Sequence, residues 1–128
     1  MKLLLDTHLL LWAALGTGQL PASATRLIND PANDLVFSAA NMWEIVIKSS
    51  LGRSDFRVNP HLLRTRLLEN GYREVSITSE HTLAVAKLPN LHRDPFDRLL
   101  IAQATVEGFT LVTSDPVVAT YKEPIVKV

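Results

Sequence analysis

Residues 1–12, MKLLLDTHLLLW, place an apolar run directly before a carboxylate, and the hydrophobic pattern resumes at Leu9. Leu3 to Leu5 are too few for a helix but are enough for a buried strand. The apolar residues after Asp6 recur at helical spacing, so this stretch predicts a strand followed by a helix. Asp6 would then stand at the edge of the core, where a carboxylate needs a cation, backbone N–H groups or a metal as its partner.

The composition is that of a compact globular protein. The chain has 128 residues, 47% of them hydrophobic, a formal net charge of +0 and no cysteine. This length predicts one domain over residues 1–128 with a core of its own. The lack of cysteine excludes disulfides and thiolate metal sites. No apolar run reaches the roughly 20 residues of a membrane helix, so we expect a cytoplasmic protein without a membrane segment.

The strand and helix of the first residues are followed by further alternation along the chain. Short strands are predicted at residues 2–5, 34–38, 74–77, 109–113 and 124–128. Helical periodicity occupies residues 9–14, 22–28, 42–49, 61–68, 83–86 and 96–106. Strands separated by helices imply right-handed crossovers, so we expect a three-layer α/β/α sandwich around a mainly parallel sheet of four to five strands.

Acidic side chains stand just beyond the predicted strands or in the helices next to them. The four acids in such positions are Asp6, Glu44, Asp97 and Asp115. In parallel sheets ligands bind outside the carboxyl ends of the strands, so these acids should converge at one edge. Ionised carboxylates repel one another unless a multivalent cation lies among them. Oxygen ligands without Cys or paired His suit Mg²⁺ or Mn²⁺ rather than Zn²⁺.

Each acid also has a purely structural interpretation as a helix cap. Asp94 precedes a proline and is a natural N-cap, with Asp97 three residues later as in a capping box. Glu44 has the same spacing after Asn41. Two further acids stand directly before a predicted helix or a proline: Asp6 and Asp115. Serine, threonine or asparagine would cap as well as these acids do, so their shared placement favours a cation site, while both interpretations stay open for each one.

Four segments together resemble the PIN-domain ribonucleases, and more narrowly the VapC-type toxins of bacterial toxin–antitoxin pairs: LLLDTHLLLW, FSAANMWEIVIK, LPNLHRDPFDRLLIAQA and LVTSDPVVATY. They occur in the family's order and span nearly the whole chain. The resemblance implies an acidic, metal-binding catalytic site made of Asp6, Glu44, Asp97 and Asp115. It leaves Asp94 as a cap and possible supporting acid, and it gives Thr113 and Ser114 the task of bracing the site.

The same resemblance implies a ribonuclease toxin that hydrolyses RNA phosphodiesters with metal-activated water and leaves a 5′-phosphate and a 3′-hydroxyl. Its cofactor would be Mg²⁺, with Mn²⁺ as an alternative. The expected partners are RNA, a small antitoxin and a second copy of the chain, with apolar surfaces offered by the helices at 22–28 and 61–68. A non-catalytic module that binds metal or RNA and holds a partner remains the alternative, because it could keep the same acids.

Cationic side chains that could contact RNA are present locally although the chain is neutral. Residues 48–73 carry six Lys or Arg against two acids, which fits either a solvated helical face or phosphate contacts. The candidates for gripping an RNA strand are Lys48, Arg93 and Arg98. Three aromatic residues lie in apolar contexts and are predicted to belong to the core: Trp12, Phe37 and Trp43.

Overall fold

One parallel sheet organises the computed structural model, which describes residues 1–128. Its strand order is β3-β2-β1-β4-β5, and every neighbouring pair is parallel. The strands are β1 (Lys2–Leu5), β2 (Asp34–Ser38), β3 (Arg73–Val75), β4 (Thr110–Thr113) and β5 (Ile125–Lys127). The predicted parallel α/β architecture is confirmed, and β3 ends two residues earlier than expected.

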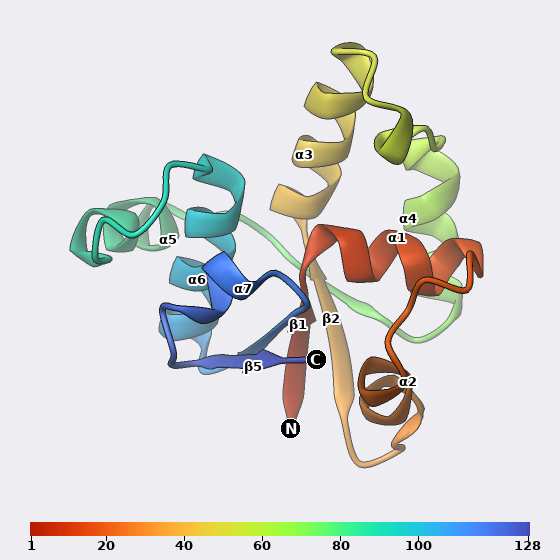
Figure 1. Ribbon diagram of the computed structural model, residues 1–128, viewed down its shortest axis with the longest axis horizontal. Helices are drawn as coiled ribbons and strands as arrows, with labels where there is room; N and C mark the ends of the chain where they lie inside the picture. The colour runs from red at the N-terminus through yellow and green to blue at the C-terminus, as the bar shows by residue number, and fades with distance from the viewer.

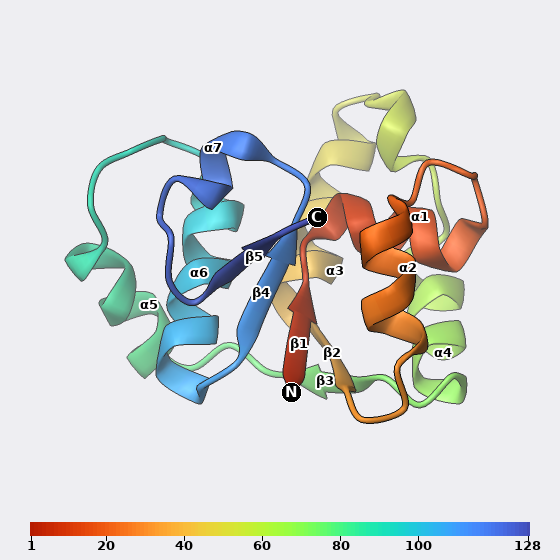
Figure 2. The same ribbon diagram turned by 60° about the horizontal axis from the view of Figure 1, so that its bottom comes forward.

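Helices cover both faces of this sheet (Figures 1 and 2). The α-helices are α1 (Thr7–Leu15), α2 (Ala22–Asn29), α3 (Ala39–Ser50), α4 (Pro60–Glu69), α5 (Ser79–Ala84), α6 (Pro95–Glu107) and α7 (Pro116–Ala119). Two short 3-10 helices are η1 (Ser54–Phe56) and η2 (Val85–Lys87). Helices α1, α2 and α4 lie on one side, α5 and α6 lie on the other, and α3 projects beyond the end of β2 (Figure 1).

Strand β1 lies in the middle of the sheet and serves both layers. Leu3 and Leu5 belong to the core that includes residues of α1, α2 and α4, whereas Leu4 belongs to the core that includes α6. All three are fully buried. Because successive side chains of a strand point to opposite faces, a central strand covered on both sides must be continuously apolar. The KLLL run therefore reflects a central position in the sheet.

The register of β1 sets the position of the acid that follows it. Leu5 pairs with Val112 of β4, and the backbone N–H of Asp6 donates to the carbonyl oxygen of Val112 at 2.9 Å. Asp6 therefore lies at the carboxyl edge of the sheet, beside the end of β4.

Two helices, α3 and α5, begin three and four residues earlier than predicted because of local capping. Helix α3 begins at Ala39 because the Ser38 hydroxyl accepts from the N–H of Ala40 while the Asn41 side chain accepts from the N–H of Ser38. Helix α5 begins at Ser79, where Thr78 and His81 form a second capping box. Helix α7 and η1 were not predicted, because four- and three-residue helices are too short to show periodicity.

The aromatic predictions are partly correct. Phe37 is fully buried and Trp12 packs against the core. The prediction for Trp43 is wrong, because 52% of this residue is exposed, although its ring meets that of Phe96 edge to face with 5.0 Å between centroids. The neighbouring apolar residues on α3 had suggested a buried face. None of the helices is both long and apolar enough to cross a bilayer.

Candidate active site

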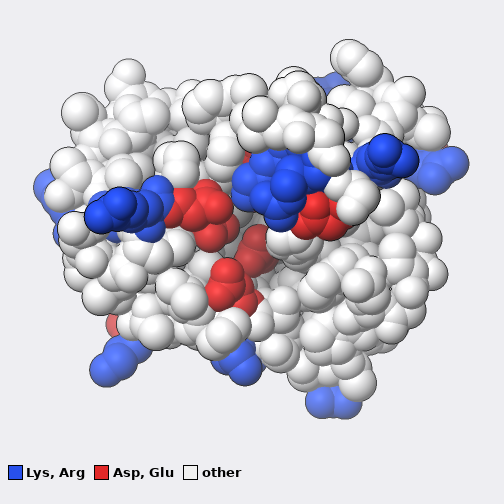
Figure 3. All heavy atoms as spheres, turned by 45° about the horizontal axis from the view of Figure 1, so that its top comes forward, with Lys and Arg blue, Asp and Glu red and all other residues white.

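Three carboxylates meet where α3 and α6 begin. Oxygens of Glu44, Asp94 and Asp97 all lie within 4.8 Å of one another. Glu44 comes from the second turn of α3, and the two aspartates come from the start of α6. On this face of the molecule, acidic side chains line a hollow and Lys and Arg side chains lie on its rim (Figure 3). The structure thus brings together Glu44 and Asp97 as predicted, and adds Asp94 as a full member of the cluster.

Asp6 is buried next to this cluster. It occupies the N-cap position of α1, but its side chain accepts no capping hydrogen bond, so the capping interpretation is wrong for this residue. Instead its Oδ2 accepts from the Thr113 hydroxyl at 2.6 Å. Burial raises the pKa of Asp6 and the charge of Asp115 raises it further, while the Thr113 hydrogen bond opposes both effects. A carboxylate at the edge of the core that caps nothing is available as a ligand.

Glu44 is almost fully buried and is held by a chain of side chains that reaches back to the sheet. Its Oε1 accepts from the Thr7 hydroxyl at 2.5 Å, and Asn41 donates to that hydroxyl at 2.8 Å. The capping box of α3 pairs Ser38 with Asn41, so the capping interpretation of Glu44 is also wrong. Its side chain is oriented by Thr7 rather than by the helix terminus.

Lys48 places a positive charge among the carboxylates. Its Nζ lies 2.5 Å from Oε2 of Glu44 and 3.4 Å from Oδ2 of Asp94, with 15% of the side chain exposed. Burial disfavours the charged ammonium, but the hydrogen bond and the charge of Glu44, together with Asp94, outweigh burial and raise the pKa of Lys48. A cation is therefore already accommodated in the cluster, and Lys48 is not free to contact RNA in this arrangement.

Asp94 and Asp97 differ in their local tasks. Oδ1 of Asp94 accepts from the N–H groups of Phe96 and Asp97 at 2.9 and 3.2 Å, so Asp94 is the predicted N-cap of α6. Asp97 caps nothing in this way. Burial, reinforced by the charges of Asp6, Asp94 and Glu44, raises the pKa of Asp97 to about 8, although Lys48 opposes the shift. An added positive charge would therefore stabilise the ionised side chain of Asp97.

Asp115 lies at the margin of the cluster. Its Oδ1 accepts from the N–H of Val117 at 2.8 Å and caps α7. Its own N–H donates to the Thr113 hydroxyl at 3.0 Å, so Thr113 links Asp115 to Asp6. Ser114, between them, is half-buried. Asp115 reaches the other acids through Asp6 and is not one of the three with oxygens within 4.8 Å of one another.

The sequence that forms this sheet and its acid cluster matches a known family. The family model described as PIN domain matches residues 3–123. The chain belongs to the PIN-domain family. Over 122 residues this PIN domain is 29% identical to ribonuclease VapC22 of Mycobacterium tuberculosis, covering 94% of the chain and 92% of the relative.

Solved PIN-domain structures share the fold. VapBC-1 from nontypeable Haemophilus influenzae matches with a TM-score of 0.65 at 18% identity, covering 94% of this chain and 92% of the matched one. VapC20 of M. tuberculosis, described as a toxin that cleaves the sarcin-ricin loop, matches with a TM-score of 0.60 at 17% identity, covering 94% and 95%. The parallel sheet and its helices are therefore those of a PIN domain.

The donor set of this PIN domain suits a divalent metal ion. Carboxylate oxygens dominate the hollow and no sulfur ligand is present, which is the chemistry of a hard cation. The partly buried ammonium of Lys48 shows where a positive charge is stabilised. Glu44 and Asp97 would hold the ion, with Asp6 and Asp94 beside them.

The two arginines near the PIN-domain site differ in availability. Arg98 donates to Tyr121 Oη at 3.0 Å and to the backbone carbonyls of Pro89 and Val85, so its guanidinium holds the loop before α6. Arg93 is exposed and forms no ion pair. Of the three predicted RNA contacts, only Arg93 is free in this structure.

Three side chains of the PIN-domain site were not predicted. Thr7 orients Glu44, as described above, and His92 lies between Asp97 and Tyr121. Thr7 and His92 stand in the DTH and HRDPFD segments, next to acids that the sequence did single out. Tyr121 follows α7 and had no such neighbour to mark it.

Proposed function

We propose that this PIN domain is a metal-dependent endoribonuclease and the toxin of a VapC-type toxin–antitoxin pair, acting on RNA in the cytoplasm. The observation that carries the proposal is the set of carboxylate oxygens from Glu44, Asp94 and Asp97 within 4.8 Å of one another, on a fold shared with VapC proteins. The relation to ribonuclease VapC22 supports the same reaction.

The proposed roles follow from the contacts of each acid. Glu44 and Asp97 would bind Mg²⁺, or Mn²⁺, through oxygens fixed in place by neighbouring side chains. Asp6, braced by Thr113, would be a further ligand, and Asp115 would support it. A divalent cation in this position lowers the pKa of bound water and neutralises charge on a phosphoryl oxygen. Arg93, on an exposed loop, would contact a phosphate of the RNA strand.

Metal removal tests the proposal directly. The purified chain should cleave single-stranded RNA in Mg²⁺, lose the activity in EDTA and regain it when Mg²⁺ is restored, leaving 5′-phosphate ends. End-labelled RNA on denaturing gels gives both the rate and the end chemistry. Retained RNA binding without cleavage in Mg²⁺ or Mn²⁺ would favour the non-catalytic binding module instead.

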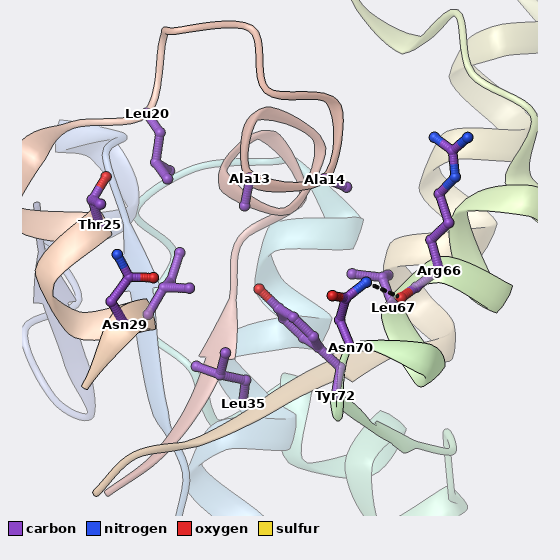
Figure 4. A pocket seen from close by; sticks show the side chains of 11 residues that line it. Ala13, Ala14, Leu20, Thr25, Asn29, Leu35, Arg66, Leu67, Asn70 and Tyr72 are labelled. Carbon is purple, nitrogen blue, oxygen red and sulfur yellow. Dashed lines mark hydrogen bonds between the residues drawn. The ribbon is translucent and has the colours of Figure 1, made fainter. Parts of the chain in front are cut away.

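We place the antitoxin in a groove between α1, α2 and α4. A cavity of about 470 Å³ is lined by Ala13, Leu20, Leu35 and Tyr72, with Arg66 at its margin (Figure 4). Ala14 and Arg66 also line a second cavity of about 220 Å³ that includes Arg57. An apolar floor flanked by two arginines fits an amphipathic segment that carries acidic residues. The expected helices at 22–28 and 61–68 form walls of this groove.

A substitution that fills the groove tests this placement. Ala14→Trp should weaken binding of the antitoxin encoded beside this chain by tenfold or more, because the indole would occupy space shared by both cavities. Calorimetry measures the affinity, and RNA cleavage by the free variant should match that of the unmodified chain. Unchanged affinity in a folded Ala14→Trp chain would place the antitoxin elsewhere.

We place the homodimer contact on the outer face of α3. Four apolar side chains with helical spacing are exposed there: Trp43, Val46, Ile47 and Leu51. Exposed apolar stripes of this kind on soluble proteins mark interfaces. A two-fold axis beside one helix would pack this stripe against its own copy. From the sequence, the helices at 22–28 and 61–68 were expected to offer the apolar partner surfaces instead.

A charge introduced into the stripe tests the dimer. Val46→Lys should convert a dimer into a monomer at micromolar concentration, because it buries two ammonium groups at the two-fold contact. Light scattering after size exclusion measures the mass, and Leu62→Lys, at an equally exposed leucine on α4, is the matched control. A Val46→Lys chain that stays dimeric would remove α3 from the interface.

A further inference from the structure

His92 lies beside the acid cluster and has no role in the reaction described so far. Its Nε2 is 3.3 Å from Oδ2 of Asp97, and only 14% of each side chain is exposed. Its Nδ1 is 2.7 Å from Tyr121 Oη, and the two rings meet edge to face with 5.2 Å between centroids. The imidazole therefore joins the start of α6 to the residue that follows α7.

The direction of these hydrogen bonds is set by Arg98. A guanidinium only donates, so Tyr121 Oη accepts the hydrogen bond from Arg98 Nη1 at 3.0 Å. The phenolic proton is then directed to its other partner, Nδ1 of His92. A neutral imidazole that accepts at Nδ1 carries its hydrogen on Nε2, which donates to Asp97. The order of donation is Arg98 to Tyr121 to His92 to Asp97.

We infer that His92 is a positioning residue for Asp97, and that Tyr121 and Arg98 fix the tautomer in which it can act. The hydrogen bond from Nε2 restrains rotation of the carboxylate and uses one of its oxygens, which leaves the other for the cation. Partners of this kind, one step removed from the metal, raise metal affinity typically 10- to 100-fold. The inference rests on the proposed metal-dependent function.

The anchor of this chain of hydrogen bonds is rigid. Arg98 is held on α6, one residue from Asp97, and its guanidinium also bonds the carbonyls of Pro89 and Val85. Tyr121 is 9% exposed. Because Arg98 and Tyr121 are both held in this way, His92 has little freedom to turn, and its position restrains the Asp97 carboxylate.

Binding of Mn²⁺, followed by electron paramagnetic resonance on the full chain, separates positioning from general structural support. In His92→Leu the dissociation constant for Mn²⁺, and the Mn²⁺ concentration that gives half-maximal cleavage, should both rise about 10- to 100-fold. The KM for RNA and the rate at saturating Mn²⁺ should change much less. His92→Gln, whose amide can donate near the position of Nε2, should restore most of the affinity.

Two further variants complete the test. Tyr121→Phe keeps the imidazole but removes the hydroxyl that fixes its tautomer, so it should weaken Mn²⁺ binding by an intermediate factor. The control is His61→Leu, at an exposed histidine on α4, which should leave Mn²⁺ binding unchanged. Normal Mn²⁺ affinity in His92→Leu, or no rescue by His92→Gln in a folded chain, would overturn the inference. If His92→Leu does not fold, an unchanged affinity in Tyr121→Phe overturns it. Absence of Mn²⁺ binding and cleavage in the unmodified chain would instead refute the proposed function.

Discussion

Asp97→Asn should lower the Mg²⁺-dependent cleavage rate by at least about a hundredfold. The substitution removes one negative charge from the centre of the cluster, where burial and the neighbouring acids already raise the pKa of Asp97 to about 8 in the absence of a divalent ion. Loss of a residue that only supports a ligand costs 10- to 100-fold, so loss of a ligand itself should cost more. Single-turnover cleavage of RNA at saturating Mg²⁺ measures the effect.

Variants of Asp94 provide the comparison. Asp94→Asn keeps the oxygen that caps α6, so it should remain folded and lose less activity than Asp97→Asn. Asp94→Ala removes the cap and should lower the free energy of unfolding by about 1 kcal/mol. Full activity in Asp97→Asn together with an inactive, stable Asp94→Asn would exchange the two assignments. Asp34→Asn, at an exposed aspartate, is the neutral control.

Without divalent ions, the stability of the chain should fall as the pH rises from 5 to 8. The pKa of Asp97 is about 8 in the folded chain and 3.8 as an ordinary value, so between these two pH values the folded state keeps a proton that the unfolded state has released. A folded state that binds more protons loses stability as the pH increases. The interval from pH 5 to pH 8 covers about 3 pH units of this shift, which corresponds to up to about 4 kcal/mol. Urea denaturation in EDTA at the two pH values measures it.

The control for this pH effect is the same titration in Asp97→Asn. An amide has no proton to lose, so this variant should show a flatter profile and should be more stable than the unmodified chain at pH 8 in EDTA. Added Mg²⁺ should stabilise the unmodified chain most at pH 8. A stability difference between the two chains that does not grow from pH 5 to pH 8 would contradict the assigned pKa of Asp97.

The positions of the strands and of most acids could be predicted from the sequence for a simple reason. A buried parallel strand is a short apolar run, and its carboxyl end lies where the run stops, so Asp6 was placed at the sheet edge by the residues before it. Glu44 was found because it lies in the helix that follows the strand at 34–38. The structure rules out the helix-cap interpretation for both residues. The Asp6 side chain makes no capping hydrogen bond, and Ser38 rather than Glu44 caps α3 with Asn41.

The remaining features depend on contacts between distant segments. His92 and Tyr121 form a hydrogen bond although they are 29 residues apart in the sequence, and the residues around neither one indicate the other. Arg98 was expected to face RNA because it neighbours Asp97, but one residue along a helix turns a side chain by about 100°, and here it points to the preceding loop. The exposure of Trp43 follows from how far α3 projects beyond the sheet, which periodicity does not specify.

The central place of β1 has a consequence for synthesis on the ribosome. Strand β1 is synthesised before the other four strands of the sheet, although it lies between β2 and β4. The Asp6 carboxylate accepts from the hydroxyl of Thr113, which is 107 residues further along the chain. No early folding intermediate made only of the first helices and strands can contain the complete acid site. A nascent chain therefore cannot assemble the acid site until α6, with Asp97, and β4, with Thr113, have been translated and have left the exit tunnel.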